Sequence, residues 1–541
     1  METITIVLAL LLAVVLSGVL SRLLPFNLPR PLVQIALGGI IGTVADWRVV
    51  LDPEIFFLLF LPPLLFLDGW RIPREELFRD ASTIVELALG LVLLTVLGMG
   101  FFINWMIPAM PLPVAFALAA VISPTDPIAV SAIAQRVPIP KRMMHILEGE
   151  SLLNDASGLV CLRFAIAATL TGAFSVQSAA LNFLGLAFGG IAIGAGLTWA
   201  VARAKAWVSR RLGEESASQV LISLLIPFGA YLLAEHFHCS GILAAVSAGL
   251  TMGWVEGRGQ ALAATRIRRS TVWDIIQFAA NGTIFVLLGE QLPAILTGAA
   301  ETVRLTGHHE PWWLIVYVFA INAGLAVLRF VWVWFSFRFT LMRRGETVRP
   351  DWKIVAAMSF AGVRGAITLA GVLTLPLALG DGAPFPARDL AILLAMGVII
   401  VSLLVASAGL PWLLRDLKMP AEAEALDAED QARIKAASAA IAEIERAEHE
   451  MASGRADADV YVAVAAEVMD LYRRRIGRLS LDAMTLEERH EIDRIERELR
   501  LAAIRAERAT IFELGDRHQV GSETARKLIR ELDLLEARYG G

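Results

Sequence analysis

The sequence predicts an all-α polytopic membrane protein, with about thirteen transmembrane helices and a separate helical domain at the C-terminal end. Apolar residues make up 56% of the 541 residues and the mean hydropathy is +0.62, which is too apolar for a soluble chain of this length. Almost half of the charged residues lie in the last 126 positions. The chain therefore divides into a transmembrane part, residues 1–415, and a charged, net-acidic tail, residues 416–541.

Apolar segments of sufficient length place the individual helices. A span needs about 20 mostly apolar residues, because the hydrocarbon core of a bilayer is about 30 Å thick. The first apolar run lacks a preceding basic region and is longer than a signal-peptide core, so we expect it to remain as the first span. The predicted spans are residues 3–24, 31–46, 51–69, 82–107, 113–136, 147–172, 180–208, 218–236, 239–255, 271–296, 312–341, 352–378 and 388–415.

Lys and Arg residues predict the orientation, since short cytoplasmic loops are enriched in them. They follow mainly the odd-numbered spans, whereas the loops after even-numbered spans contain only Arg48, Arg304 and Arg388. We therefore expect the N-terminus outside and the tail in the cytoplasm. The tail is rich in Ala, Glu and Arg, which favours solvated helices in a hairpin or small bundle, and its acidic composition disfavours a nucleic-acid partner.

Span 5 contains an ionisable residue between two prolines, in the string Ser123-Pro124-Thr125-Asp126-Pro127. Prolines remove amide donors and interrupt the helical ladder, and a broken helix at membrane depth is tolerated where it lines a cavity or is buried in protein. The break frees carbonyl groups next to a carboxylate, so a cation can be coordinated there. The alternative is a proline kink in which Asp126 only caps a helix.

Span 6 places three oxygen-bearing side chains close together. Ser151 and Asp155 are four residues apart and share a helical face, and Asn154 lies beside them. Hard oxygen ligands of this kind suit small alkali cations, whereas a d-block metal would favour His or Cys. We interpret the nearby Glu150 as structural.

Span 12 contains a second weak point, where Gly362 and Gly365 surround Arg364. Spans 5 and 12 are equivalent if spans 1–6 are paired with spans 8–13. Because equivalent spans are then an odd number of spans apart, they cross the membrane in opposite directions. This predicts two inverted repeats with broken helices near the midplane, as in secondary transporters. Arg364 requires an acidic partner, for which Glu150 is the candidate; the alternative is an arginine that extends to the interface.

Asp68 at the end of span 3 is a further candidate, although it is equally explained as a helix-end acid near the interface. Single charges near span ends are more often anchors than ligands, so four others receive no role: Glu86, Arg163, Asp274 and Arg329.

The strings SPTDPIAV, EGESLLNDASG, FAGVRGAITLA and NGTIFVLLGEQL resemble the cation:proton antiporters of the NhaP and NHE type, in their order and spacing over residues 1–415. The resemblance implies thirteen spans in a bacterial inner membrane. It also implies a homodimer that joins a rather static dimerisation domain to a mobile six-helix core with crossed, broken helices in spans 5 and 12. The expected function is antiport, not enzymatic catalysis.

The resemblance also assigns roles to individual residues. Asp155 matches the essential acid that binds either sodium or a proton, and Asp126 matches the ligand in the unwound helix. Sodium would be held by Asp126, Ser151 and Asp155, with the main-chain carbonyl of Thr125 and, through water, Asp68. Glu150 and Arg364 match a buried ion pair. Asn154 stands where electrogenic relatives have a second Asp, which implies one sodium for one proton.

A common physical argument supports this mechanism. A carboxylate in a low-dielectric pocket resists ionisation, and either a sodium ion or a proton offsets that penalty, so the two ions compete for Asp155 and Asp126. Exchange of sodium or lithium for protons by alternating access follows without any cofactor and would serve pH and sodium homeostasis. Potassium/proton antiport remains open. A gated cation channel would need a continuous pore, and a membrane-anchored sensor would act through its tail.

Overall fold

The computed structural model describes residues 2–23, 28–44, 53–72, 81–126, 130, 141–171, 176–256, 262–304, 312–343, 352–379, 382–414, 423–453, 458–479, 486–517 and 519–540. Several loops whose basic residues predicted the orientation lie outside these ranges, as do Pro127 and most of the second half of span 5. The chain separates into two compact units, Met1–Lys418 and Met419–Gly541, each described here on its own.

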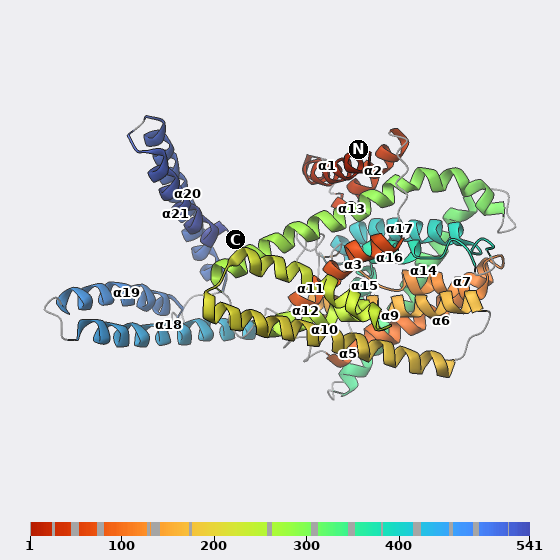
Figure 1. Cartoon of the computed structure of the whole chain (residues 1–541), viewed down its shortest axis with the longest axis horizontal. Helices are drawn as coiled ribbons and strands as arrows, with labels where there is room; N and C mark the ends of the chain where they lie inside the picture. The colour runs from red at the N-terminus through yellow and green to blue at the C-terminus, as the bar shows by residue number, and fades with distance from the viewer. Residues whose placement is uncertain are drawn as a thin grey trace. The chain divides into compact units, whose positions relative to one another are not determined.

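The first unit is built from helices (Figure 1). Their bounds are α1 Glu2–Leu23, α2 Arg30–Val44, α3 Pro53–Arg71, α5 Ala81–Val85, the π-helix η1 Glu86–Gly90, α6 Leu91–Met106, α7 Leu112–Ile122, α9 Lys141–Thr171, α10 Val176–Leu212, α11 Ser216–His236, α12 Gly241–Glu256, α13 Ala263–Arg304, α14 Trp312–Arg343, α15 Trp352–Phe360, α16 Ala366–Leu373 and α17 Arg388–Leu414.

The helices agree with the predicted spans and confirm a polytopic all-α fold. Within the described ranges, eight helices are long and apolar enough to cross a membrane, and α2, α7 and α12 are shorter apolar helices. Both expected breaks are present, since α7 ends at Ile122 before the non-helical residues 123–126, and residues 361–365 separate α15 from α16.

The helix contacts fall into two groups. The scaffold group comprises α1–α3 and α10–α13, and the core group comprises α5, η1, α6, α7, α9 and α14–α17. In the predicted repeat, each of spans 1–6 corresponds to the span seven places later in the chain. The contact of α2 with α13 is then equivalent to that of α12 with α3, and the contact of α1 with α13 is equivalent to that of α11 with α3. In the core group, α6 with α7 maps onto α14 with α15. The contact pattern thus follows the predicted inverted repeat.

Glycines allow the two equivalent scaffold contacts to be close. A Cβ atom at Gly38 would overlap the Val286 carbonyl between α2 and α13, and one at Gly249 would overlap the Phe66 carbonyl between α12 and α3. Small residues at helix interfaces let backbones approach in membranes, where packing has to replace the hydrophobic effect. These contacts bring the helices of the scaffold group into close backbone contact.

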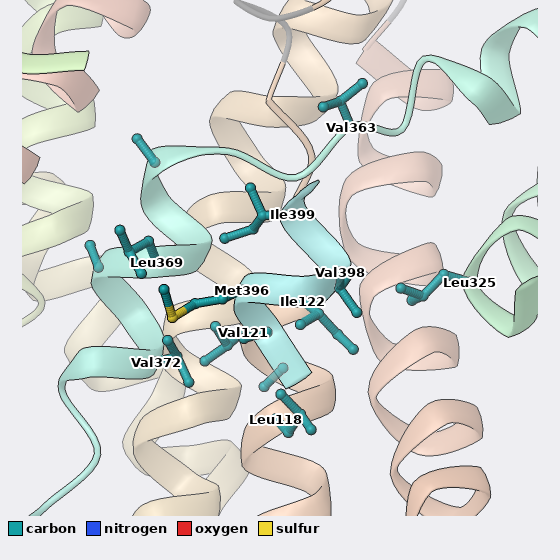
Figure 2. Packing of buried hydrophobic residues seen from close by; sticks show 14 of the residues in the cluster. Leu118, Val121, Ile122, Leu325, Val363, Leu369, Val372, Met396, Val398 and Ile399 are labelled. Atoms are coloured by element: carbon teal, nitrogen blue, oxygen red, sulfur yellow. The ribbon is translucent and has the colours of Figure 1, made fainter. Parts of the chain in front are cut away.

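Apolar side chains fill the space around the two breaks in the core group. Figure 2 shows Val121 and Ile122 of α7, Leu369 of α16 and Val398 of α17 within one packed cluster, and all four are at most 2% exposed. Close-packed interiors of this kind have low compressibility, so neighbouring groups have little room to shift. Apolar packing of α7, α16 and α17 therefore surrounds the breaks.

The second unit consists of two antiparallel helix pairs. Helix α18 (Ala423–Ala452) lies beside α19 (Ala458–Leu479), and α20 (Leu486–Asp516) contacts α21 (Ser522–Gly540) (Figure 1). Arg508 joins the second pair by ionic contacts with Asp533, at 2.9 Å, and with Glu536. The helical tail that the composition predicts is thus present as hairpins.

Candidate cation-binding site

Two hydrogen bonds join the unwound segments to one another. The amide of Asp126 donates a hydrogen bond of 2.7 Å to the carbonyl oxygen of Val363. In the opposite direction, Nε of Arg364 donates a hydrogen bond of 2.9 Å to the carbonyl oxygen of Ile122, the last residue of α7. Peptide groups freed by each break thus have partners in the other break, which buried backbone groups require.

The charges near the two breaks have the signs that stabilise the adjacent helix dipoles. Arg364 places its cation at the C-terminal end of α7, where unsatisfied carbonyls carry negative potential. The Asp126 side chain lies against Gly365, immediately before the positive N-terminal end of α16. A Cβ atom at Gly365 would overlap the Asp126 carboxylate, so this close approach requires glycine. Each break is therefore matched to a charge of the appropriate sign.

Helix α9 supplies the second set of ligands. Oγ of Ser151 donates to Oδ2 of Asp155 at 3.5 Å, one turn along the same face, and both residues are 3% exposed. Nδ2 of Asn154 donates to Oγ1 of Thr125 at 3.0 Å, which connects α9 to the break of span 5. The arrangement orients Asn154 towards Thr125 and leaves Asp155 and Ser151 facing the space between the helices.

These groups line one small cavity. Its volume is about 20 Å³, which is room for a single water-sized particle. Among the described residues, no group of three His, Cys, Asp or Glu side chains is placed to hold one metal ion. The polar residues that the structure brings to the cavity are Asp68, Thr125, Asp126, Ser151, Asp155, Asn281 and Thr368.

The prediction that Glu150 is the acidic partner of Arg364 is wrong. Glu150 forms its ion pair with Arg329 of α14, through contacts of 2.5 and 2.8 Å, and these side chains are 0% and 2% exposed. Arg329 Nε also donates to the carbonyl oxygen of Met358 near the end of α15. Glu150 faces α14 because it lies on a different side of α9 from Asp155, whereas Arg364 is occupied by backbone carbonyls.

Arg364 instead holds the two breaks together. Besides Ile122, its guanidinium donates to the carbonyl oxygen of Gly362, and its own amide donates to Oγ of Ser402 at 3.1 Å. Among the described residues it forms no ion pair. A guanidinium has five donors in a fixed plane, so it can satisfy several freed carbonyls at once.

The remaining unassigned charges also have partners. Oε2 of Glu86 in the π-helix accepts a hydrogen bond from Ser336 at 3.1 Å. Arg163 of α9 pairs with Glu235 of α11 at 2.8 Å, between the core and scaffold groups. Asp274 pairs with Arg71 at the surface. Of the four, only Arg329 approaches the candidate site.

Sequence reasoning missed Arg329 and Asn281. Arg329 receives no role from the sequence, although its position deep within a long apolar span is a signal of a buried partner. Asn281, an amide within span 10, was part of a string that carried the family resemblance but received no role. It lies on the scaffold side of the cavity together with Asp68, opposite the ligands of the core group.

Comparison with known proteins agrees with this geometry. Residues 7–416 match the family model described as the transmembrane sodium/hydrogen exchanger. A protein of Escherichia coli (strain K12) named uncharacterized Na(+)/H(+) exchanger YjcE is 42% identical over 526 residues, which cover 95% of each chain. A sodium, potassium, lithium and rubidium/H(+) antiporter of Bacillus pumilus is 39% identical over 545 residues, covering 100% of this chain and 78% of the relative.

A solved structure supports the fold. The sodium proton antiporter MjNhaP1 of Methanocaldococcus jannaschii aligns with a TM-score of 0.61 and 21% identity, over 77% of this chain and 99% of that one. The match of nearly the whole transmembrane unit and the 42% identity over 95% of the chain lead to one conclusion. The chain belongs to the sodium/hydrogen exchanger family.

Proposed function

We propose that this protein exchanges sodium or lithium for protons across a bacterial inner membrane, by alternating access and with one cation per proton. The observation that carries the proposal is the cavity where the two broken helices meet Asp155. It has room for one water-sized particle and is lined by the carboxylates of Asp68, Asp126 and Asp155. In that site, Asp155 and Asp126 are the exchanging carboxylates.

Burial explains why the two ions alternate. An ionised carboxylate away from water is strongly destabilised unless a cation or a proton neutralises it. The site is therefore most costly when empty, so movement of the core group is favoured only when it is loaded. Sodium would be held by the carboxylates of Asp126 and Asp155, Oγ of Ser151 and the carbonyl of Thr125, with Asp68 reached through water.

The position of the cavity supports alternating access. Asp68 and Asn281 come from the scaffold group, whereas Thr125, Asp126 and Asp155 come from the core group. Movement of the core group relative to the scaffold would carry the main ligands away from Asp68 and Asn281. Those two residues would then contact the ion in only one of the two states.

Asn154 supports the one-to-one stoichiometry. It carries no titratable group, and its amide is used to hold Thr125 at 3.0 Å. Glu150 is paired with Arg329, so Asp155 is the acid on this part of α9 that can bind either sodium or a proton. One sodium ion replaced by one proton moves no net charge.

The orientation, the domain roles and the assembly belong to the same proposal. The Lys and Arg distribution favours an outside N-terminus and a cytoplasmic tail. Residues 1–415 would perform transport, and residues 416–541 would at most regulate it. Two copies would pair through their scaffold groups, as the family resemblance implies.

Cation-dependent dequenching of a pH-sensitive dye in proteoliposomes tests the function. Sodium or lithium added to acid-loaded vesicles should release protons, with potassium compared at the same concentration. Because the Bacillus pumilus relative is named for sodium, potassium, lithium and rubidium, a potassium response would make potassium an additional substrate. Absence of a response to all three ions would contradict the proposal, and single-channel currents would favour a channel instead.

A further inference from the structure

A cavity of about 520 Å³ lies away from the candidate cation site, between the ends of α10, α11, α12 and α13 that are predicted to face the cytoplasm. Two further hollows, of about 150 and 480 Å³, adjoin it along α10 and share Arg210 with it. Together they form a groove that begins between helices and opens at the surface of α10. We refer to it as the α10 groove, defined by Trp199, Arg203, Lys205, Trp207 and Arg210.

The two acidic residues of the larger cavity already have partners. Glu256 accepts a hydrogen bond of 2.9 Å from Trp70 Nε1 and forms an ion pair with Arg269. Oε2 of Glu214 accepts the backbone amide of Leu262 at 3.1 Å. The ion pair with Arg269 neutralises Glu256, whereas Oε1 of Glu214 is buried without a hydrogen-bond partner among the described residues.

The cations of the groove have no such partners. Arg203, Lys205 and Arg210 form no ion pair within the described part of the chain, and Arg210 Nε donates only to the carbonyl oxygen of Ala206. Arg203 and Arg210 line the outer hollows, which have no acidic residue. The three hollows together are lined by the cations Arg203, Lys205, Arg210 and Arg269 and by the carboxylates of Glu214 and Glu256, an excess of two positive charges. This excess leaves the groove complementary to an anionic ligand.

Aromatic residues accompany these cations on one face of α10. Trp199, Arg203, Trp207 and Arg211 follow each other at intervals of four residues, and so lie on one side of the helix. Trp199 and Trp207 are 52% and 53% exposed, and the Arg211 guanidinium lies 4.6 Å from the centre of the Trp207 ring. Tryptophan and basic residues at the end of a span are typical of the membrane–water interface.

We propose that the α10 groove binds the headgroup of one anionic phospholipid. The phosphate would be bound by Arg203, Lys205 and Arg210, and the acyl chains would lie along the exposed apolar surface of α10. Basic pockets between transmembrane helices on the cytoplasmic side recognise such headgroups by charge. A phospholipid satisfies both the unpaired cations and the apolar surface, whereas free phosphate satisfies only the cations.

The test compares a groove variant with a charge-matched control. Lys205→Gln/Arg210→Gln removes two groove cations, and Arg22→Gln/Arg30→Gln removes two exposed basic residues from another loop predicted to face the cytoplasm. Full-length, delipidated protein in detergent is titrated with phosphatidylglycerol or phosphatidylcholine. Bound lipid is counted by native mass spectrometry, and thermal unfolding is followed in parallel.

Wild-type protein and the control should bind phosphatidylglycerol at least tenfold more tightly than phosphatidylcholine, and the groove variant should lose most of this preference. Should that variant fail to fold, the single change Arg203→Gln at an exposed position should still reduce the preference severalfold. An unchanged preference in the groove variants, or an equal loss in the control, would overturn the proposal. Equal thermal stabilisation by inorganic phosphate and by phosphatidylglycerol would also overturn the proposal, because the acyl chains would then contribute nothing. The proposal would likewise fail if dimers dissociated in phosphatidylcholine and phosphatidylglycerol had no effect on them.

Discussion

Glu150 of α9 and Arg329 of α14 form an ion pair with two hydrogen bonds, of 2.5 and 2.8 Å, in the interior of the core group. Arg329 extends the connection to the carbonyl oxygen of Met358, and Oγ1 of Thr125 lies 3.4 Å from Oε1 of Glu150. The pair therefore links α9 and α14 to the residues that flank both breaks. The pair contacts Thr125, which lines the cation cavity, but neither of its own side chains is part of that lining.

Removing one partner of this pair should destabilise the protein strongly. Arg329→Ala or Glu150→Ala leaves a buried charge uncompensated, which typically costs about 3–5 kcal/mol. Replacing both, as Glu150→Gln with Arg329→Gln, should be milder than either alanine change. Thermal or chemical unfolding in detergent measures the differences. The exposed pair Arg446–Glu443 provides the control, since Arg446→Ala should cost less than about 1 kcal/mol. Equal effects at both pairs would contradict the structural role of Glu150 and Arg329.

Gly365→Ala should abolish exchange while the protein remains folded. The added methyl group would overlap the Asp126 carboxylate, so either that ligand or the segment before α16 has to move. Displacements of about 1 Å at a preorganised site reduce rates by about 100-fold. Gly196→Ala is the matched control, because its Cβ would meet no atom within 4 Å. Normal sodium-dependent exchange in Gly365→Ala would show that Asp126 does not need this position.

Membrane voltage should leave the exchange rate unchanged. One sodium exchanged for one proton moves no net charge, so the free energy of the transport cycle does not depend on the membrane potential. If one net charge moved per cycle, the potential would change that free energy by about 2.3 kcal/mol per 100 mV. Proteoliposomes with a potassium gradient and valinomycin provide the potential. The control is the same vesicle population without valinomycin. A rate that rises steeply with voltage would require a second charge to move and would exclude the role inferred for Asn154.

The transmembrane unit should transport without the tail. The described contacts separate at Lys418, and the cation cavity uses only residues of the first unit. A chain ending at Lys418 should therefore retain sodium-dependent proton release, with any change limited to its pH or concentration dependence. Proteoliposomes with equal amounts of full-length and shortened protein make the comparison. Loss of all exchange in a folded, shortened protein would assign the tail a direct role.

The sequence predicted those features that follow from local rules. Apolar length determined the helices, prolines beside Asp126 and glycines beside Arg364 determined the two breaks, and helical spacing placed Ser151 and Asp155 on one face. These arguments need no knowledge of which helices pack together. The inverted repeat could also be predicted, because it follows from counting spans between the two breaks.

The partners of charged side chains could not be predicted in this way. Arg364 and Arg329 are both arginines within apolar spans, and which one meets Glu150 depends on the rotation of α9 against α14. Asn281 likewise became part of the cavity only because α13 packs close to the core group. The unpaired cations of the α10 groove are visible only when four helix ends are assembled. Tertiary packing, which periodicity does not specify, decides all three.

Sodium-dependent proton release by Asp155→Asn in proteoliposomes tests the central claim most directly. The change keeps the shape of the side chain but removes the charge that sodium and the proton are proposed to share, and Asp126→Asn provides a second test of the same cavity. Asp389→Asn is the control, since that carboxylate is 81% exposed. Wild-type protein and the control should release protons when sodium is added, and both cavity variants should not differ from protein-free vesicles. Exchange retained in Asp155→Asn and Asp126→Asn would show that the cation is carried elsewhere.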